Sequence, residues 1–291
     1  MRYEFDNIDS YKFIDIHYHV NPDMYLRRHT AIQAGQEYKK YEGAVFLKSH
    51  LGSTVQSAVI AQDLGLPVFP SLTLNKITGG VTIKTIKRHL CEYTSHINMS
   101  FLVHLPTITQ NHTHKPKVKR IFTNKHMEDV SRSPEIITES SKLKSSVIDV
   151  LKFVKDNQIV ISTGHASYDE TMLLIEACNK IGYKRLLLNQ PANPISGFCY
   201  EKLKNISSDN VWIEQTLLTY KLGYQSWDDI SSTLQNLPNV IYSSDFGQIS
   251  QPDIENWFME SNDIFSKIKL SDKRKKEVQL ENPLRLLKER R

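Results

Sequence analysis

The segment FIDIHYHV, residues 13–20, opens on large apolar residues and carries two histidines toward its end. Its apolar positions are almost continuous, which is typical of a parallel strand that is buried on both faces. Similar runs recur along the chain, at residues 44–49, 67–74, 98–106, 158–163, 185–189, 210–215 and 239–244. The sequence therefore predicts eight buried parallel strands.

Amphipathic segments separate these runs and predict helices, at residues 29–41, 54–64, 82–95, 143–156, 168–181, 197–206, 226–236 and 251–268. Alternating strands and helices favour a parallel sheet with right-handed crossovers. Eight such units in 291 residues favour an α/β fold of the (β/α)8 TIM barrel type, which typically needs roughly 250 residues. A doubly wound open sheet is the alternative, but the glycine-rich phosphate loop of that fold does not follow the first strand.

We expect a single domain over residues 1–291, with two additions to the barrel. After the fourth strand, residues 107–142 form a long connection rich in His, Lys, Thr and Ser. This length and composition predict a lid over the barrel mouth, with a mobile surface loop as the alternative. An extra helix at about residues 272–290 is expected to cover the barrel bottom or to contact a partner chain. The histidines of the lid are His112, His114 and His126.

Composition limits the class of protein. Apolar residues make up 40% and charged residues 24%, and the formal net charge is +5. Basic residues are not interleaved with aromatics, which argues against a nucleic-acid partner. No apolar run approaches the roughly 20 residues of a membrane helix, and the three cysteines share no disulfide or zinc spacing. We expect a cytoplasmic protein that acts on a small-molecule substrate, with association into a homo-oligomer left open.

Polar and ionisable side chains fall at the C-terminal ends of the predicted strands. In a barrel these ends meet at one mouth, where catalytic groups lie. Chance would scatter such groups between both ends, so the pattern predicts a functional site at the mouth. The groups are His17, His19, Lys48, His50, Asn75, His104, Thr107, His165, Asn189, Gln190, Glu214 and Asp245.

His17 and His19 are the first candidate metal ligands. Residues i and i+2 of a strand point to the same side, so both imidazoles can share one ion. Asp15 precedes them on that side and is expected to fix a histidine tautomer. Two core histidines are the alternative. Asp245 directly follows the last strand, where the role of helix N-cap is the alternative, and His165 has the same ambiguity.

Together these motifs resemble the amidohydrolase superfamily of metal-dependent barrel hydrolases. The segments FIDIHYHVNPD, VFLKSHLGST, SLTLNKITGG, LVHLPT, STGHAS and SSDFGQ resemble one branch of it, over about residues 13–287. The resemblance implies that His17, His19, His165 and Asp245 bind a divalent ion and that Asp245 also accepts the proton of the attacking water. Zinc is the first expectation, and manganese, iron and nickel are alternatives because the same ligands accept them.

Two departures from the superfamily bear on the number of ions. A further histidine usually ends the sixth strand, where this chain has Asn189 and Gln190, and no histidine follows His165. One ion is therefore expected rather than two. The bridging lysine of the superfamily usually lies on the fourth strand, whereas Lys48 lies on the second. Lys48 is carboxylated and bridges two ions, binds a substrate anion as a cation, or simply lines the mouth.

The resemblance implies a hydrolase in which a metal-activated water attacks an amide or cyclic amide of a small anionic substrate, with an ester or phosphoester as the alternative bond. His50 and Lys48 would stabilise the developing oxyanion beside the base Asp245, and His50 is alternatively a ligand or proton shuttle. A metal-dependent lyase, decarboxylase or isomerase, and a metal-free binding protein, are the other function classes. The expected substrate-binding residues are Asn75, His104, Gln190 and Glu214.

Overall fold

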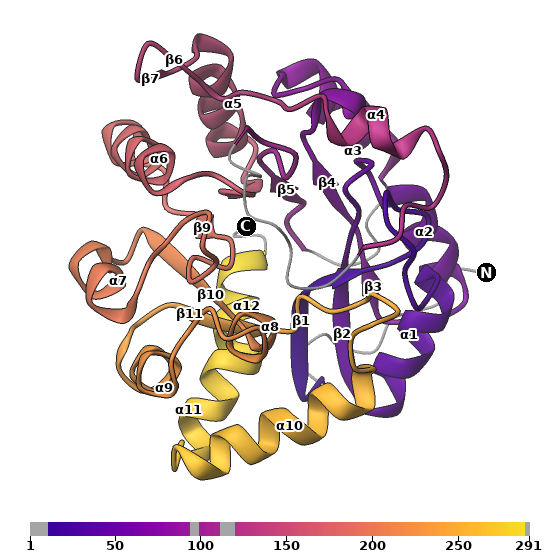
Figure 1. Ribbon diagram of the computed structural model, residues 1–291, viewed down its shortest axis with the longest axis vertical. Coiled ribbons are helices and arrows are strands. Elements are labelled where there is room, and N and C mark those ends of the chain that lie inside the picture. Colours follow the sequence, from indigo (N-terminus) through magenta and orange to yellow (C-terminus); the bar gives the residue numbers. More distant parts are fainter. Residues whose placement is uncertain (1–10, 94–98, 111–119, 289–291) are drawn as a thin grey trace.

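The computed structural model describes residues 11–93, 99–110 and 120–288. His112 and His114 of the predicted lid lie outside these residues. The described chain is a mixed α/β domain in which parallel strands lie inside and helices lie outside (Figure 1). Among the described helices, none is both long and apolar enough to span a membrane.

The parallel strands form two sheets that coincide with the eight predicted runs. The first sheet has the order β1 (Phe13–His19), β2 (Gly43–Lys48), β3 (Val68–Phe69). The second has the order β11 (Val240–Ser243), β10 (Val211–Thr216), β9 (Leu186–Leu188), β8 (Val160–Ser162), β5 (Leu102–His104), β4 (Ser71–Thr73). The third predicted run is split into β3 and β4 at Pro70, because proline has no N–H to donate to a neighbouring strand.

The predicted helices are also present. The one at residues 168–181 has its predicted bounds, and the others are shorter by a few residues at one or both ends. They are α1 (Ala31–Lys40), α2 (Val55–Asp63), α3 (Ile83–Glu92), α5 (Ser145–Asp156), α6 (Tyr168–Ile181), α7 (Tyr200–Ile206), α9 (Trp227–Asn236) and α10 (Ile254–Lys267). The sequence did not predict the shorter elements. These are η2 (Lys76–Thr78), α4 (Met127–Ser131), α8 (Leu217–Lys221) and the antiparallel hairpin of β6 (Thr138–Glu139) and β7 (Lys142–Leu143).

Alternate residues of the strands pack on opposite faces. Val45, Val103 and Ile161 belong to the large apolar cluster between strands and helices. Their neighbours face the other way into an inner apolar cluster, which includes Phe46, Leu102, Val160, Leu187, Trp212 and Ile241. Two residues further along each of these strands, the inner face carries a buried polar side chain. We call these residues the polar layer: Lys48, His104, Ser162, Asn189, Glu214 and Ser243.

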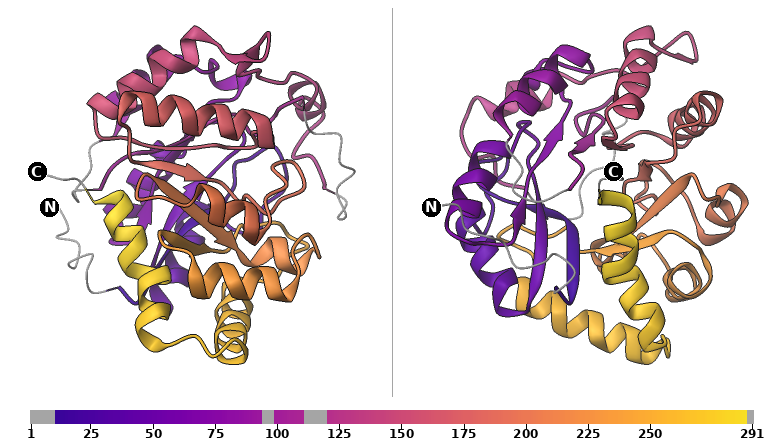
Figure 2. Two further views of the ribbon diagram at one scale, coloured as in Figure 1. Left: turned by 90° about the vertical axis from the view of Figure 1, so that its left-hand side faces the viewer. Right: turned by 180° about the vertical axis from the view of Figure 1, so that it is seen from behind.

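The C-terminal segment covers the apolar end of the inner cluster. It runs through α11 (Asp272–Lys276), a π-helical stretch (Glu277–Glu281) and α12 (Asn282–Leu287). Leu286 is fully buried in the inner apolar cluster, and Asn282 Nδ2 donates to the carbonyl oxygen of Val240, at the start of β11, over 2.8 Å. The segment, yellow in Figure 2, therefore lies against the N-terminal ends of the strands, opposite to the polar layer.

Candidate metal centre

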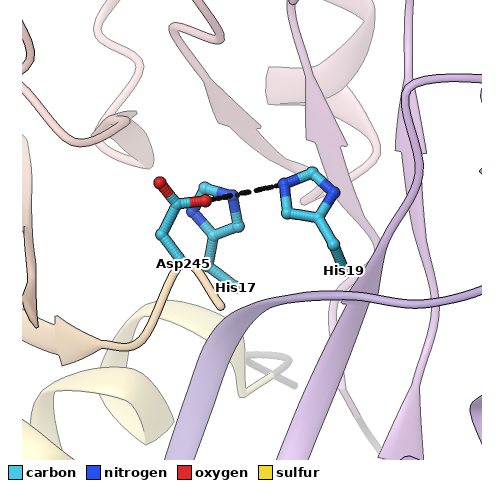
Figure 3. Close-up of side chains that lie close together, drawn as sticks. All are labelled: His17, His19 and Asp245. Atoms are coloured by element: carbon cyan, nitrogen blue, oxygen red, sulfur yellow. Dashed lines mark hydrogen bonds and ion pairs between the residues drawn. The ribbon is translucent and has the colours of Figure 1, made fainter. Parts of the chain in front are cut away.

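Three predicted ligands, His17, His19 and Asp245, converge at the C-terminal ends of β1 and β11 (Figure 3). Nε2 of His17 lies 3.3 Å from Nε2 of His19. Oδ1 of Asp245 lies 3.0 Å from Nε2 of His17 and 3.5 Å from Nε2 of His19. Tetrahedral ligands at about 2.1 Å from a zinc ion lie roughly 3.4 Å apart. This buried donor set therefore fits a cation of that size.

A bulge in β1 turns both imidazoles into the site. Between Asp15 and Tyr18 the pairing with β2 slips by one residue, so β1 contains one residue more than its partner. An extra residue reverses the alternation of side chains along a strand. Ile16 can therefore belong to the inner apolar cluster while His17 and His19 face inward above it.

Asp245 has a strained backbone that is pressed against β1. Its φ of 55° lies in the left-handed region, which is unfavourable for a residue with a side chain. The N–H of Asp245 donates to the carbonyl oxygen of His17 over 3.0 Å. The N–H of His19 donates to the carbonyl oxygen of Phe246 over 2.9 Å. At Gly247 a Cβ would lie 2.0 Å from the carbonyl oxygen of His19. Glycine thus permits the close approach that brings Asp245 over the imidazoles.

Glu214, on β10, orients His17. Its Oε1 lies 2.9 Å from His17 Nδ1 and accepts from Ser243 Oγ over 2.7 Å, and its Oε2 accepts from the N–H of Gln190 over 2.9 Å. A carboxylate on Nδ1 leaves Nε2 free for a cation. Burial lowers the pKa of His17, but the charges of Asp245 and Glu214 outweigh it and raise the pKa to about 9. The surroundings of His17 therefore favour positive charge.

The carboxylate of Asp23 contacts both His19 and Arg27. Oδ2 of Asp23 lies 3.3 Å from Nδ1 of His19 and 2.6 Å from Nη2 of Arg27. His19, Asp23 and His50 are close enough to hold a second cation. The buried guanidinium already neutralises Asp23, however, which favours one ion over two. Sequence reasoning did not single out Asp23 or Arg27, although Asp23 lies four residues after His19 in a quoted motif.

Asp15 does not contact a histidine ring in the way that the sequence predicted. Its Oδ1 accepts from the N–H of His17 over 3.0 Å and from the N–H of Ser244 over 3.1 Å. Its Oδ2 accepts from the hydroxyl of Tyr38 on α1. The carboxylate therefore ties the first strand to the last, and the β1 bulge is the reason that it faces the helices.

The predicted catalytic residues Lys48 and His50 lie beside the cluster. Lys48 Nζ donates to Asn189 Oδ1 over 2.9 Å, and burial lowers its pKa to about 8. The ring centroids of His50 and His19 are 4.8 Å apart. His50 Nδ1 lies 2.8 Å from Thr107 Oγ1, so its other ring nitrogen is the one available to a ligand.

The predicted substrate-binding residues differ in what they already contact. Asn75 Nδ2 donates to the carbonyl oxygen of His50 and to Thr107, so the amide of Asn75 joins two loops. His104 Nδ1 lies 3.0 Å from Ser162 Oγ. Gln190 is buried, with a φ of 36°. A substrate-binding role for these residues and for Glu214 stays a prediction.

His165, the fourth predicted ligand, lies near His50. The two ring centroids are 6.1 Å apart, and His165 is half-buried. Neither of the two groups of described residues that could hold an ion includes His165. Its role as a ligand therefore stays a prediction.

The comparison with protein families gives one match. Residues 12–214 match the model of DUF6282, a family of unknown function. No curated protein matches the chain. The matched region holds His17, His19 and Glu214 and ends before Asp245. Because the match covers well over half of the sequence, the chain belongs to the family DUF6282.

Proposed function

We propose that the protein is a metal-dependent hydrolase that cleaves an amide or cyclic amide of a small molecule. The convergence of His17, His19 and Asp245 on one point carries this proposal, and Glu214 behind His17 supports it. A divalent ion held there, zinc first and manganese, iron or nickel as alternatives, supplies a Lewis acid that polarises a carbonyl group and acidifies a water molecule.

A closed (β/α)8 barrel is part of the proposal. Pro70 alone separates β3 of the first sheet from β4 of the second, which supports continuity at that edge. At the other edge, Tyr18 of β1 pairs in a parallel bridge with Phe246, which follows β11. In such a barrel the polar layer lies inside, at the C-terminal mouth where active sites are found.

Asp245 is the proposed general base. Burial opposes its ionisation, but the neighbouring imidazoles of His17 and His19 hold its pKa well below the usual range. The carboxylate is therefore ionised at neutral pH, can accept a proton from water, and can pass it to the leaving group. His50, next to His19, is the proposed donor to the oxyanion that develops on the substrate.

Elemental analysis tests the metal centre. We expect about one equivalent of a transition metal per chain after reconstitution with zinc, and loss of that metal in His17→Ala and His19→Ala. His126→Ala is the matched control, because His126 is an exposed histidine. Less than about a tenth of an equivalent in the reconstituted wild type would contradict the proposal and favour a metal-free binding protein.

Labelled water tests the reaction class. The zinc-loaded protein is incubated with a panel of N-acyl amino acids and cyclic amides in ¹⁸O water, and mass spectrometry follows the products. Hydrolysis places one labelled oxygen in the new carboxylate, and Asp245→Asn should slow it by a factor of about 100 or more. Turnover without label would instead favour a lyase, decarboxylase or isomerase.

A further inference from the structure

Lys48 is a buried cation that makes no direct ion pair among the described residues, although the carboxylates of Glu214, Asp245 and Asp23 act on it from farther away. Its side chain lies in the polar layer and is 1% exposed. Its Nζ donates to Asn189 Oδ1, which belongs to a neutral amide, and none of the ion pairs of the described residues includes Lys48. Buried charges in proteins are normally paired. An ammonium group has three donors, so two of them remain for a ligand.

Two further nitrogens of the polar layer have no partner among the described residues. These are Asn189 Nδ2 and His104 Nε2, both buried. Ser162 Oγ accepts from the N–H of Gly164 and donates to Asn189 Oδ1 over 3.4 Å. Because the hydroxyl proton is used in that bond, His104 Nδ1 donates to Ser162 Oγ over 3.0 Å and Nε2 carries a lone pair. Asn189 Nδ2 is therefore the second unused donor, beside the ammonium group of Lys48.

The three unused groups belong to one chain of contacts next to the metal centre. The chain of contacts runs from Lys48 on β2 to Asn189, directly after β9. It continues to Ser162 on β8 and then to His104 on β5. The ring centroid of His104 lies 6.2 Å from that of His17. The ammonium group of Lys48 and the amide N–H of Asn189 both donate. Such a pair complements an oxyanion, to which charge-assisted hydrogen bonds are strong.

We propose that Lys48 and Asn189 form a binding subsite for a carboxylate. If the proposed hydrolase function holds, on which this consequence rests, the substrate carries a carboxylate beside the bond that is cleaved. A carboxylate offers about four lone-pair sites and can therefore accept from several donors at once. Asn189, which stands at the end of the sixth strand where a histidine was expected, becomes a specificity-determining residue rather than the mere loss of a ligand.

The test is a calorimetric titration of metal-free protein with acetate and formate, and with sulfate as a tetrahedral anion. Without metal, a carboxylate cannot bind through a bound ion. We expect saturable binding of acetate with one site per chain and weaker binding of sulfate. Lys48→Met removes the charge at similar side-chain length, and Asn189→Asp adds a repelling charge at the same shape. Each should weaken acetate binding by about tenfold or more.

The control is Lys152→Met, which removes an exposed lysine from α5 and should leave the affinity for acetate unchanged. Circular dichroism verifies that each variant is folded. Absence of saturable acetate binding in the wild type overturns the subsite. So does a wild-type affinity for acetate in both folded variants, Lys48→Met and Asn189→Asp. Zinc content is measured separately. Acetate binding without zinc binding supports the carboxylate subsite and contradicts the proposed hydrolase function. Zinc binding without acetate binding contradicts the subsite and leaves the proposed hydrolase function standing.

Discussion

Nδ1 of His17 lies 2.9 Å from Oε1 of Glu214, and both side chains are buried. The other oxygen of this carboxylate is taken by the N–H of Gln190, and Ser243 donates to the first. Glu214 therefore influences the candidate metal centre through the orientation and charge of His17.

Replacing Glu214 by glutamine should weaken zinc binding by about 10- to 100-fold, the usual effect of losing such a carboxylate. In Glu214→Gln the side-chain NH2 group replaces one carboxylate oxygen. It must face either Nδ1–H of His17 or the N–H of Gln190, so two donors point at each other and one hydrogen bond is lost. Competition with a chromophoric chelator measures the affinity. Ser243→Ala, which removes one hydrogen bond to the same carboxylate, should cost less than about tenfold. Wild-type affinity in Glu214→Gln would refute the orienting role.

Gly247→Ala should destabilise the protein by at least about 3 kcal/mol, because the new Cβ would lie 2.0 Å from the carbonyl oxygen of His19 at a φ of 121°. Gly182→Ala is the control. Its φ is 69°, but no atom lies within 4 Å of a Cβ there, so only backbone strain of about 1–2 kcal/mol is expected. Urea unfolding gives both free energies. Equal costs would show that the contact with β1 is dispensable.

Cys178 should resist alkylation in the folded protein. Burial raises the pKa of its thiol to about 12, so at pH 8 roughly one molecule in ten thousand carries the thiolate. Cys91 and Cys199 are exposed. Peptide mass spectrometry after treatment with iodoacetamide should find these two modified, and Cys178 modified only after unfolding in urea. Equal modification of all three in native protein would mean that the face of α6 that carries Cys178 is not packed in the large apolar cluster.

Leu286→Ala should lower the free energy of unfolding by about 2–5 kcal/mol, because Leu286 is fully buried under the ends of the strands. Leu64→Ala provides the comparison, since Leu64 is 57% exposed and its loss should change stability by less than about 0.5 kcal/mol. Urea unfolding followed by tryptophan fluorescence measures both. A cost for Leu286→Ala as small as that for Leu64→Ala would mean that the C-terminal segment is only loosely attached.

The strands and longer helices could be predicted because hydrophobic periodicity is a local property of the sequence. FIDI and VIYS are recognisable as buried strands without knowledge of their neighbours. The order of polar residues at strand ends likewise indicated His17, His19, His165 and Asp245 as a group, and all of these except His165 lie together. Short elements such as α4 and α8 carry too few residues for a periodic signal, and the sequence did not reveal them.

The partners of each side chain could not be predicted in the same way. The β1 bulge depends on register with β2, and it turned Asp15 away from the imidazoles that it was expected to orient. The carboxylate that does contact His17 comes from Glu214, on a strand far away in sequence. The pairing of Asp23 with Arg27 likewise follows from the turn after β1, whose path the pattern of apolar residues does not encode.

The bridge between Tyr18 and Phe246 joins the first strand to the segment that follows the last. On the ribosome, His17 and His19 are synthesised early, whereas Asp245 is synthesised only after all the described strands. The first half of the molecule therefore cannot complete the candidate metal centre during translation. A fragment that stops at residue 214 keeps every histidine of the chain but lacks the carboxylate of Asp245. Binding of a cation would therefore indicate that β1 and the segment after β11 have come together.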